Sequence, residues 1–468
     1  MMKLNYRIHF RMWCGLPART TKLSAGWQPT PHFLRQSFFG SFVLLVCLCS
    51  FAVAQPNRPN IIFILADDYG VGEVSAYGAD NYKTPNIDAL AKGGTRYTRA
   101  YTPSLCGPSR ATLMTGRYLF RTGATNQDAT GRFTPEAETM MPKILKTAGY
   151  VTAAVGEWGQ LPLGPAEFGF DEYLKFQGSG AYWNTQDKAR RYLVNGKQTP
   201  LRDKEYLPDV MHQFAVDFIT KNHDKPFYLY YSMSHVHGEI LPTPDSAPDS
   251  KDIYADNVTY MDKLVGKLIA ELDRQKLREK TLLVFFGDNG TANPRADRAT
   301  IGGRRLDGAK GSMLEGGNLV PLIVNWPGVT PAGKVRADMI DSSDFVPTFA
   351  ELAGAKLPEK KIIDGRSFAA SIRGEKKQAR EWVFLQLAGK WYTRDAGWKL
   401  TQAGELFDMS DAPFAEKLVA ADTKDAAAIA ARKRLQAALD QLNPAGGFVD
   451  DGDGTGRHAN KQLKKKEK

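Results

Sequence analysis

Apolar runs alternate with amphipathic segments along most of the chain. Five runs have the length and the aliphatic or aromatic composition of strands buried in a parallel sheet. Between them, apolar residues recur with a period near 3.6, which predicts helices. Strand–helix alternation predicts an α/β fold, a doubly wound, mostly parallel central sheet with helices on both faces. The predicted strands are 60–66, 150–155, 227–233, 281–286 and 319–325, and the predicted helices are 86–92, 141–147, 209–221, 254–275 and 344–352.

The pattern changes after about residue 380. Short strands are predicted over 381–387, 390–393 and 398–401, followed by a segment at 405–408 and an Ala-rich helix over 425–442. They indicate a small C-terminal α+β subdomain with a short antiparallel sheet. We therefore predict a main domain over 55–380, this subdomain over 381–445 and a disordered basic tail over 446–468. Residues 451–456 resemble the start of a calcium-binding EF-hand loop but lack its final Glu, and we interpret them as a linker.

The N-terminal segment has the three parts of a secretory signal peptide. Residues 1–37 are basic and contain no acid, residues 38–48 are mostly apolar, and Ala52-Val53-Ala54 ends the segment like a cleavage site. We predict a signal peptide over 1–54 and a protein that is exported, either periplasmic or secreted. The alternative is a retained membrane anchor, but the apolar run is short for a bilayer span, so we expect no stable membrane insertion.

The net charge of +11 is concentrated at the two ends of the chain. Six of the positive charges lie within residues 1–37, and residues 461–468 carry five Lys against one Glu. The remainder is close to neutral, which argues against a general nucleic-acid binder. With 43% hydrophobic and 24% charged residues, the composition is that of an ordinary globular protein.

Cysteine usage draws attention to one position. Three of the four cysteines, Cys14, Cys47 and Cys49, lie in the predicted signal peptide, so the exported protein keeps Cys106 alone. A lone cysteine in an oxidising compartment is either buried and inert or a reactive thiol.

Polar side chains follow three of the predicted strands at the point where each ends. The carboxyl ends of parallel strands meet at one edge of a sheet, where ligands collect. Carboxylate, amide and imidazole groups converging there predict a metal or catalytic centre. They are Asp67 and Asp68 after 60–66, His235 and His237 after 227–233, and Asp288 and Asn289 after 281–286.

Cys106 lies where a short helix is expected to begin. Pro108 suits a first helical turn, and Gly116 suits the end of the helix. Free N–H groups and the helix dipole favour anions at such a start, and Arg110 lies one turn further on. This pattern predicts a site for a tetrahedral oxyanion, with phosphate and sulfate both qualifying.

The segment from Cys106 to Arg117 resembles the signature of the type I sulfatase family, Cys-x-Pro-Ser-Arg followed by Thr-Gly-Arg. Further blocks resemble that family in the same order, and together they span roughly residues 58–415. Several blocks in order are far more specific than one motif. The blocks are 60–70, 84–91, 286–290, 310–317, 320–328 and 404–408.

The resemblance implies a hydrolase of sulfuric esters. In this family a separate formylglycine-generating maturase oxidises the cysteine, here Cys106, and the hydrated aldehyde attacks the sulfate. The resemblance further implies that Arg110 stabilises the hydrate, that Lys310 binds sulfate oxygens, and that His237 lies on the leaving-group side. Oxygen ligands suit Ca²⁺, with Mg²⁺ as the alternative. The implied metal ligands are Asp67, Asp68, Asp288, Asn289 and an oxygen derived from Cys106.

Two positions depart from the family pattern. The family commonly has Gly-Lys-Trp-His after the strand near residue 150, where this chain has Glu157 for the lysine and Gly159 for the histidine. A glutamate in a sulfate cavity is repulsive unless it is protonated or turned away. A base could come from His235, His237 or His212, Glu157 could recognise a hydroxyl or a cation, or the enzyme could be slow or inactive.

Three functions compete: a sulfatase acting on a sulfated carbohydrate or an aryl sulfate, a phosphonate or phosphate-diester hydrolase on the same scaffold, and a weakly active binder of sulfated glycans. We expect a sulfated small molecule or glycan as the substrate. Tyr182, Trp183 and Ser179 could line a sugar pocket or belong to the core. Arg304 and Arg305 could be a solvated face or bind substrate.

Overall fold

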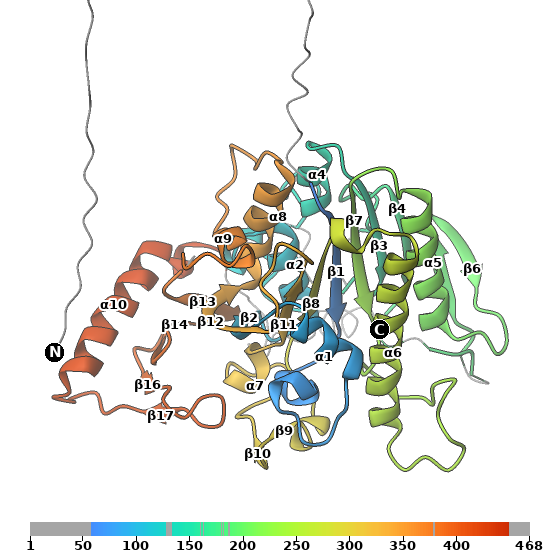
Figure 1. Ribbon diagram of the computed structural model, residues 1–468. Coiled ribbons are helices and arrows are strands. Elements are labelled where there is room, and N and C mark those ends of the chain that lie inside the picture. Colours follow the sequence, from blue (N-terminus) through green and yellow to red (C-terminus); the bar gives the residue numbers. More distant parts are fainter. Residues whose placement is uncertain are drawn as a thin grey trace, which may run out of the picture. The chain divides into compact units, whose positions relative to one another are not determined.

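A ten-stranded sheet forms the centre of the fold in the computed structural model (Figure 1). The structure describes residues 58–448 apart from 128–132, 160, 162, 179, 181, 186–187 and 378–379. The predicted signal peptide, the EF-hand-like segment, Ser179 and the tail beyond residue 448 lie outside the described residues.

Most strands of this sheet run in one direction. The exceptions are β11 and β5, which pair antiparallel with their neighbours. The predicted mostly parallel sheet is therefore confirmed. In spatial order the strands are β12 (Lys334–Asp341), β2 (Thr95–Tyr101), β11 (Leu322–Asn325), β8 (Thr281–Gly287), β1 (Asn60–Ala66), β7 (Phe227–Met233), β3 (Val151–Gly156), β4 (Glu172–Phe176), β5 (Arg191–Val194) and β6 (Lys197–Pro200).

Helices cover both faces of the sheet, as predicted (Figure 1). Side chains of β1 alternate between the faces, so Ile62 and Ile64 pack in one apolar core while Phe63 and Leu65 pack in the other. The first core contains residues of α1 (Pro85–Lys92), α5 (Leu207–Lys221) and α6 (Ile253–Arg274). The second contains residues of α2 (Cys106–Thr115), α4 (Met141–Lys146) and α8 (Phe345–Ala353).

One predicted strand differs in length and direction. The run 319–325 was expected to be parallel, but β11 covers Leu322–Asn325 and is antiparallel to β8 and β2. Pro321 before it has no N–H to donate to a ladder, which accounts for the later start. An apolar run indicates burial on both faces and carries no information on direction.

A second, antiparallel sheet follows, as predicted for the C-terminal subdomain. Asp425 caps the helix packed on it by accepting hydrogen bonds from the N–H groups of Ala427 and Ala428. The helix contributes Leu435 and Leu439 to a core shared with Phe384 and Leu400. The elements are β13 (Val383–Leu387), β14 (Lys390–Arg394), β15 (Trp398–Thr401), β16 (Leu406–Asp408), β17 (Lys417–Leu418) and α10 (Ala426–Leu442).

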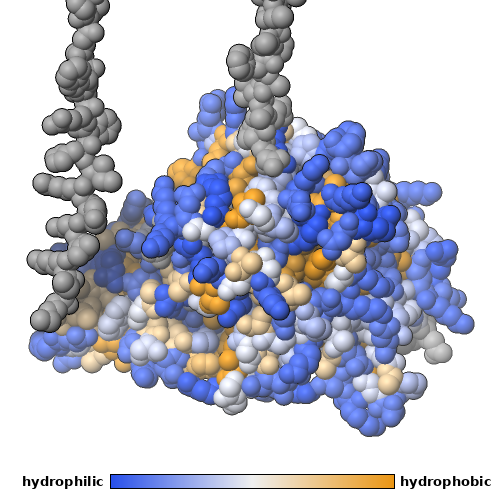
Figure 2. All heavy atoms as spheres, in the orientation of Figure 1, coloured by the Kyte–Doolittle hydropathy of each residue, from blue (hydrophilic) through white to orange (hydrophobic). Residues whose placement is uncertain are grey.

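Short elements complete the described part. They include a hairpin of β9 (Thr300–Ile301) and β10 (Arg304–Arg305), and the one-turn helices α3 (Leu119–Thr122), α7 (Glu315–Asn318) and α9 (Ala369–Ile372). On the face in Figure 2, hydrophilic residues dominate and hydrophobic ones occur in small groups. Among the described helices, none has both the length and the apolar character needed to cross a bilayer.

Candidate active site

The ends of β1 and β8 bring the predicted acidic residues together. The two strands are parallel neighbours, and Ala66 is paired with Gly287. The N–H of Asp288 donates to the carbonyl of Ala66 at 3.0 Å, and the N–H of Asp68 donates to Asp288 Oδ1 at 2.9 Å. Asn289 Nδ2 donates to Asp68 Oδ1 at 2.8 Å. Carboxylate oxygens of Asp67 and Asp68 lie within 4.8 Å of each other. Asp67, Asp68, Asp288 and Asn289 therefore form one buried group, the acidic cluster, at the carboxyl edge of the sheet.

The backbone at this edge is locally unusual. Asp68 has a φ of 57°, and Val236, between the two histidines after β7, has a φ of 66°. Positive φ is tolerated by Asp but is an outlier for a β-branched residue such as Val. Such conformations concentrate at functional sites, where the surrounding structure holds them in place.

Cys106 is the first residue of α2, as predicted, and its side chain points into the acidic cluster. Its Sγ lies 3.3 Å from Asp67 Oδ1 and 3.8 Å from Asp68 Oδ1. Burial raises the pKa of the thiol well above its usual value, and the carboxylates of Asp288 and Asp67 raise it further. The unmodified thiol is consequently protonated and a poor nucleophile at neutral pH.

Arg110, one turn along α2, forms ion pairs with two carboxylates of the acidic cluster. Its Nη2 donates to Asp288 Oδ2 at 2.9 Å and lies 3.5 Å from Asp67 Oδ2. Its Nη1 donates to the carbonyl of Glu157 at 2.8 Å and to the Tyr230 hydroxyl at 3.1 Å. The side chain is 1% exposed, so this guanidinium orients carboxylates and is shielded from solvent.

Lys310 and His237 approach the cluster from two other segments. Lys310 Nζ lies 3.2 Å from Cys106 Sγ and forms an ion pair with Asp68. Although burial lowers the pKa of Lys310, the nearby carboxylates of Asp68 and Asp67 raise it, so the ammonium is charged. His237 Nε2 lies 3.6 Å from Asp68 Oδ2. Both side chains remain partly exposed, at 13% and 16%, and can therefore meet a ligand.

Glu157 faces the cluster from the end of β3. Its buried carboxyl shares a hydrogen bond with Asp67. Burial and the charge of Asp67 raise the pKa of Glu157 well above its usual value. The pKa of Asp67 is lowered despite burial, because His237 and the hydrogen bond from Glu157 stabilise its charged form. Glu157 is thus the protonated partner, which explains how a glutamate occupies this position.

Gly159 leaves the space that Arg110 fills. A Cβ placed on Gly159 would lie 2.2 Å from Cδ and 2.7 Å from Nε of Arg110, and its φ is 72°. A histidine at this position is therefore incompatible with the observed Arg110 side chain. Arg110 also donates to the main-chain carbonyl of Glu157, so both positions that depart from the family pattern contact this arginine.

The other candidate residues are further from the cluster. His235 is fully buried beside Tyr206 and Tyr260, and burial lowers its pKa to about 3. Burial also lowers the pKa of His212, to about 4. Neither ring has a hydrogen bond or ion pair with the acidic cluster in the described part of the chain, so we retain His237 as the candidate.

Tyr182 belongs to the core and supports the site indirectly. It is fully buried, and its hydroxyl donates to the carbonyls of Ser234 and His237 at 2.8 Å. Trp183 is partly buried and donates from Nε1 to the carbonyl of Pro242. Sequence patterns did not identify Tyr230 and Ser232, which both accept from Arg110, because they lie inside an unbroken apolar strand.

The side chains present fit a hard divalent cation. Besides the protonated Glu157, three acidic side chains, Asp67, Asp68 and Asp288, are buried together against two cations, Arg110 and Lys310. Asn289 Oδ1 is buried and accepts no hydrogen bond from any described residue. A cation bound by carboxylate and amide oxygens would satisfy this atom and the excess negative charge.

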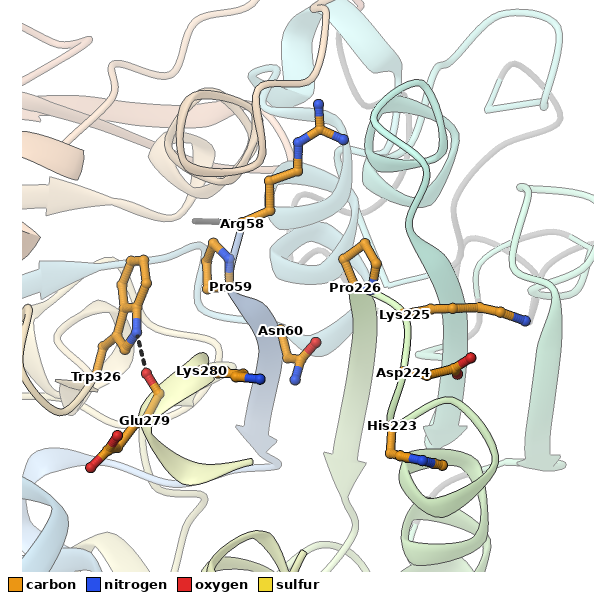
Figure 3. A pocket seen from close by; sticks show the side chains of 10 residues that line it. All are labelled: Arg58, Pro59, Asn60, His223, Asp224, Lys225, Pro226, Glu279, Lys280 and Trp326. Atoms are coloured by element: carbon orange, nitrogen blue, oxygen red, sulfur yellow. Dashed lines mark hydrogen bonds between the residues drawn. The ribbon is translucent and has the colours of Figure 1, made fainter. Parts of the chain in front are cut away.

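A cleft of about 680 Å³ opens beside Lys310, lined by residues of the 293–313 segment and by Leu387 and Lys390. A different pocket of about 350 Å³ lies at the opposite edge of the sheet, where β1 and β7 begin (Figure 3). Arg58, Lys225 and Lys280 line it together with Asp224 and Glu279. Because the strand ends that carry the acidic cluster point away from it, this second pocket is remote from the candidate site.

Comparisons with known proteins agree with the geometry. The family model described as Sulfatase matches residues 59–355. Steryl-sulfatase of Homo sapiens is 31% identical over 74% of this chain and 74% of its own length. N-acetylgalactosamine-6-sulfatase of Canis lupus familiaris is 32% identical over 69% of this chain and 67% of its own. The solved structure of Ps i-CgsB in complex with k-i-k-neocarrahexaose is 29% identical, covers 85% of this chain and 96% of its own, and has a TM-score of 0.71.

Proposed function

Since the chain belongs to the type I sulfatase family and is a sulfuric ester hydrolase, we propose that it cleaves its substrate with a formylglycine derived from Cys106 and a bound Ca²⁺ ion. The observation that carries the proposal is the position of Cys106 Sγ, between Asp67 at 3.3 Å and Lys310 at 3.2 Å. A nucleophile grown from this side chain would face both the acidic cluster and a cation. Mg²⁺ is the alternative ion.

The proposed ligands of the ion are Asp67, Asp68, Asp288, Asn289 and an oxygen derived from residue 106. The hydrogen bonds that join Asp68 to Asp288 and Asn289, the short separation of Asp67 and Asp68, and the buried Asn289 Oδ1 without a hydrogen bond support this set. When bound, the ion would neutralise sulfate oxygens and acidify the attacking hydroxyl. Arg110 would keep Asp67 and Asp288 in place, because it pairs with both.

The remaining roles follow from accessibility and charge. Formylglycine supplies, once hydrated, a hydroxyl nucleophile whose sulfated form can break down again to the aldehyde, a route closed to serine. Lys310 would hold sulfate oxygens, since its ammonium is charged and faces Cys106. His237 would contact the ester oxygen or protonate the leaving group. The main-chain carbonyl of His237 accepts a hydrogen bond from Tyr182, which holds the backbone that carries the ring.

The substrate we propose is a sulfated carbohydrate or aryl sulfate. The likeness to an N-acetylgalactosamine-6-sulfatase and to a structure solved in complex with k-i-k-neocarrahexaose supports a glycan substrate. We further propose that the protein is exported, as the predicted signal peptide suggests, and that a formylglycine-generating maturase modifies Cys106. An aryl phosphate or phosphonate ester is the competing substrate class, because the same cluster could hold a phosphoryl group.

Mass spectrometry of the peptide that contains Cys106 tests the chemistry directly. After coexpression with a competent maturase we expect a loss of about 18 Da relative to the thiol. Paired aryl sulfate and aryl phosphate esters then distinguish the substrate classes, with turnover expected on the sulfate. Cys106→Ala should remain folded without turnover. An unmodified thiol in an active preparation, or an active Cys106→Ala protein, would refute the proposal.

A further inference from the structure

The cleft beside Lys310 is cationic along its length. Its charged lining residues are Lys310, Arg305 and Lys390, and no acidic side chain is among the described residues that line it. Lys310 forms the inner end, where its Nζ contacts Cys106. The volume of about 680 Å³ lies within the range typical of ligand sites. The cleft therefore has room for part of a substrate beyond the sulfate that reacts.

Two separate parts of the fold supply the outer charges. Arg305 belongs to the β9–β10 hairpin, and Lys390 begins β14 in the C-terminal sheet. Arg304, the neighbour of Arg305, is held away by an ion pair with Asp411 at 2.8 Å and by the ring of Phe414. Successive side chains of a strand point to opposite sides, which leaves Arg305 on the side of the cleft.

These outer charges are available to a ligand. Arg305 pairs with Asp297 at 2.8 Å, but both side chains are about half exposed, so water weakens the pair. Lys390 is exposed and forms no ion pair within the described residues. An ammonium and a guanidinium that line one cleft, with no acidic side chain among its described lining residues, favour an anionic ligand group.

We propose that Arg305 and Lys390 form a second anion-binding subsite, and that the substrate is a saccharide with at least two anionic groups. The reacting sulfate ester would lie at Cys106 and Lys310, while a second sulfate or a carboxylate of the same saccharide would lie at Arg305 and Lys390. This inference rests on the proposed function for the position of the reacting group. It adds that the substrate carries at least two anionic groups, a property that family membership does not specify.

The test measures binding separately from turnover. Calorimetry on the Cys106→Ala protein would measure the binding of three disaccharide probes. The buffer would contain roughly 2 mM CaCl₂, above the dissociation constants typical of extracellular calcium sites. One probe carries a single sulfate, one carries sulfates on both rings, and one carries a single sulfate and a uronate. The informative quantity is the affinity ratio of each dianionic probe to the monosulfated one. A preference for the disulfated or the uronate probe identifies the second group.

We expect the preferred dianionic probe to bind about tenfold more tightly than the monosulfated one at 50 mM NaCl, with a smaller ratio at 300 mM because salt screens exposed charges. Lys390→Gln and Arg305→Gln should each lower this ratio to about threefold or less, and Lys390→Arg should restore it. Lys280→Gln, which removes an exposed lysine from the pocket at the opposite edge (Figure 3), should leave the ratio unchanged.

Equal affinities for all three probes would overturn the subsite, and so would a ratio that Lys390→Gln and Arg305→Gln leave intact. Failure of the proposed function has a different signature. In that case the maturase-treated wild-type protein would hydrolyse no sulfate ester, while the charge-dependent binding ratio could persist in calorimetry.

Discussion

Replacing Gly159 with alanine tests the packing on which the altered site depends. The new Cβ would lie 2.2 Å from Cδ of Arg110, which is far inside contact distance. Arg110 cannot move aside cheaply, because its guanidinium is held by Asp288, the Glu157 carbonyl and Tyr230. Gly159→Ala therefore forces either a displaced arginine or a displaced loop.

The cost has two separable parts. Placing alanine at a φ of 72° costs about 1 kcal/mol relative to glycine. Overpacking against a fixed side chain adds about 1–3 kcal/mol. Gly328→Ala is a matched control, because Gly328 has a φ of 77° and no heavy atom within 4 Å of an added Cβ. The difference between the two variants isolates the contact with Arg110.

The assay is denaturant unfolding of both variants, followed by kcat/KM on an aryl sulfate. We expect Gly159→Ala to lose about 1–3 kcal/mol more unfolding free energy than Gly328→Ala. Its kcat/KM should fall about a hundredfold, because a shift of about 1 Å in Arg110 misplaces Asp67 and Asp288. Equal stability and unchanged turnover in the two variants would show that Arg110 does not occupy this space.

Three further outcomes follow from the same contacts. Asp288→Asn should weaken Ca²⁺ binding about tenfold or more in calorimetry, since it removes one carboxylate charge from the proposed ligand set. Glu157→Gln keeps a hydrogen-bond donor toward Asp67, so its unfolding free energy in urea should stay within about 1 kcal/mol of the wild-type value. Glu157→Ala removes the donor and should lose about 1–3 kcal/mol of unfolding free energy. His235, with its pKa lowered to about 3, favours the fold when neutral. Its contribution is therefore fully present above the ordinary pKa of about 6.5 and is lost as pH falls below it. Between pH 8 and pH 5, protonation of this histidine in the unfolded chain should lower the unfolding free energy of the wild-type protein by about 2 kcal/mol. The unfolding free energy of His235→Phe should not show this decrease, and an identical pH dependence in the two proteins would contradict the assignment.

The sequence was informative where one local rule decided the structure. Strands β1 and β7 were predicted with the observed bounds, because each is an unbroken apolar run buried on both faces. Strands β2 and β12 were missed, because their polar residues are partly exposed and interrupt the pattern. The antiparallel direction of β11 was also missed, since direction depends on neighbours that periodicity does not identify.

The same limit applies to the site. Asp67 and Asp288 were predicted to converge because each directly follows a buried strand, and they do. The pairing of Glu157 with Asp67 and the fit of Arg110 against Gly159 could not be predicted, because both depend on side-chain positions across strands. The cationic cleft is a further case, since Lys390 comes from the second sheet.

The two residues that depart from the family pattern, Glu157 and Gly159, also change how the substrate must be bound. The family pattern places a lysine and a histidine beside the sulfate, but here a protonated glutamate and a glycine take their positions. Arg110 does not replace the lost cation toward the substrate, because it is 1% exposed and its charge is used by Asp67 and Asp288. Lys310 and His237 then remain as the partly exposed basic groups at the reacting end. A sulfate held by fewer cations binds less tightly on its own, so affinity must come from elsewhere on the substrate. Arg305 and Lys390 offer that affinity to a second anion, which links the altered catalytic end of the cleft to the other cationic residues that line it.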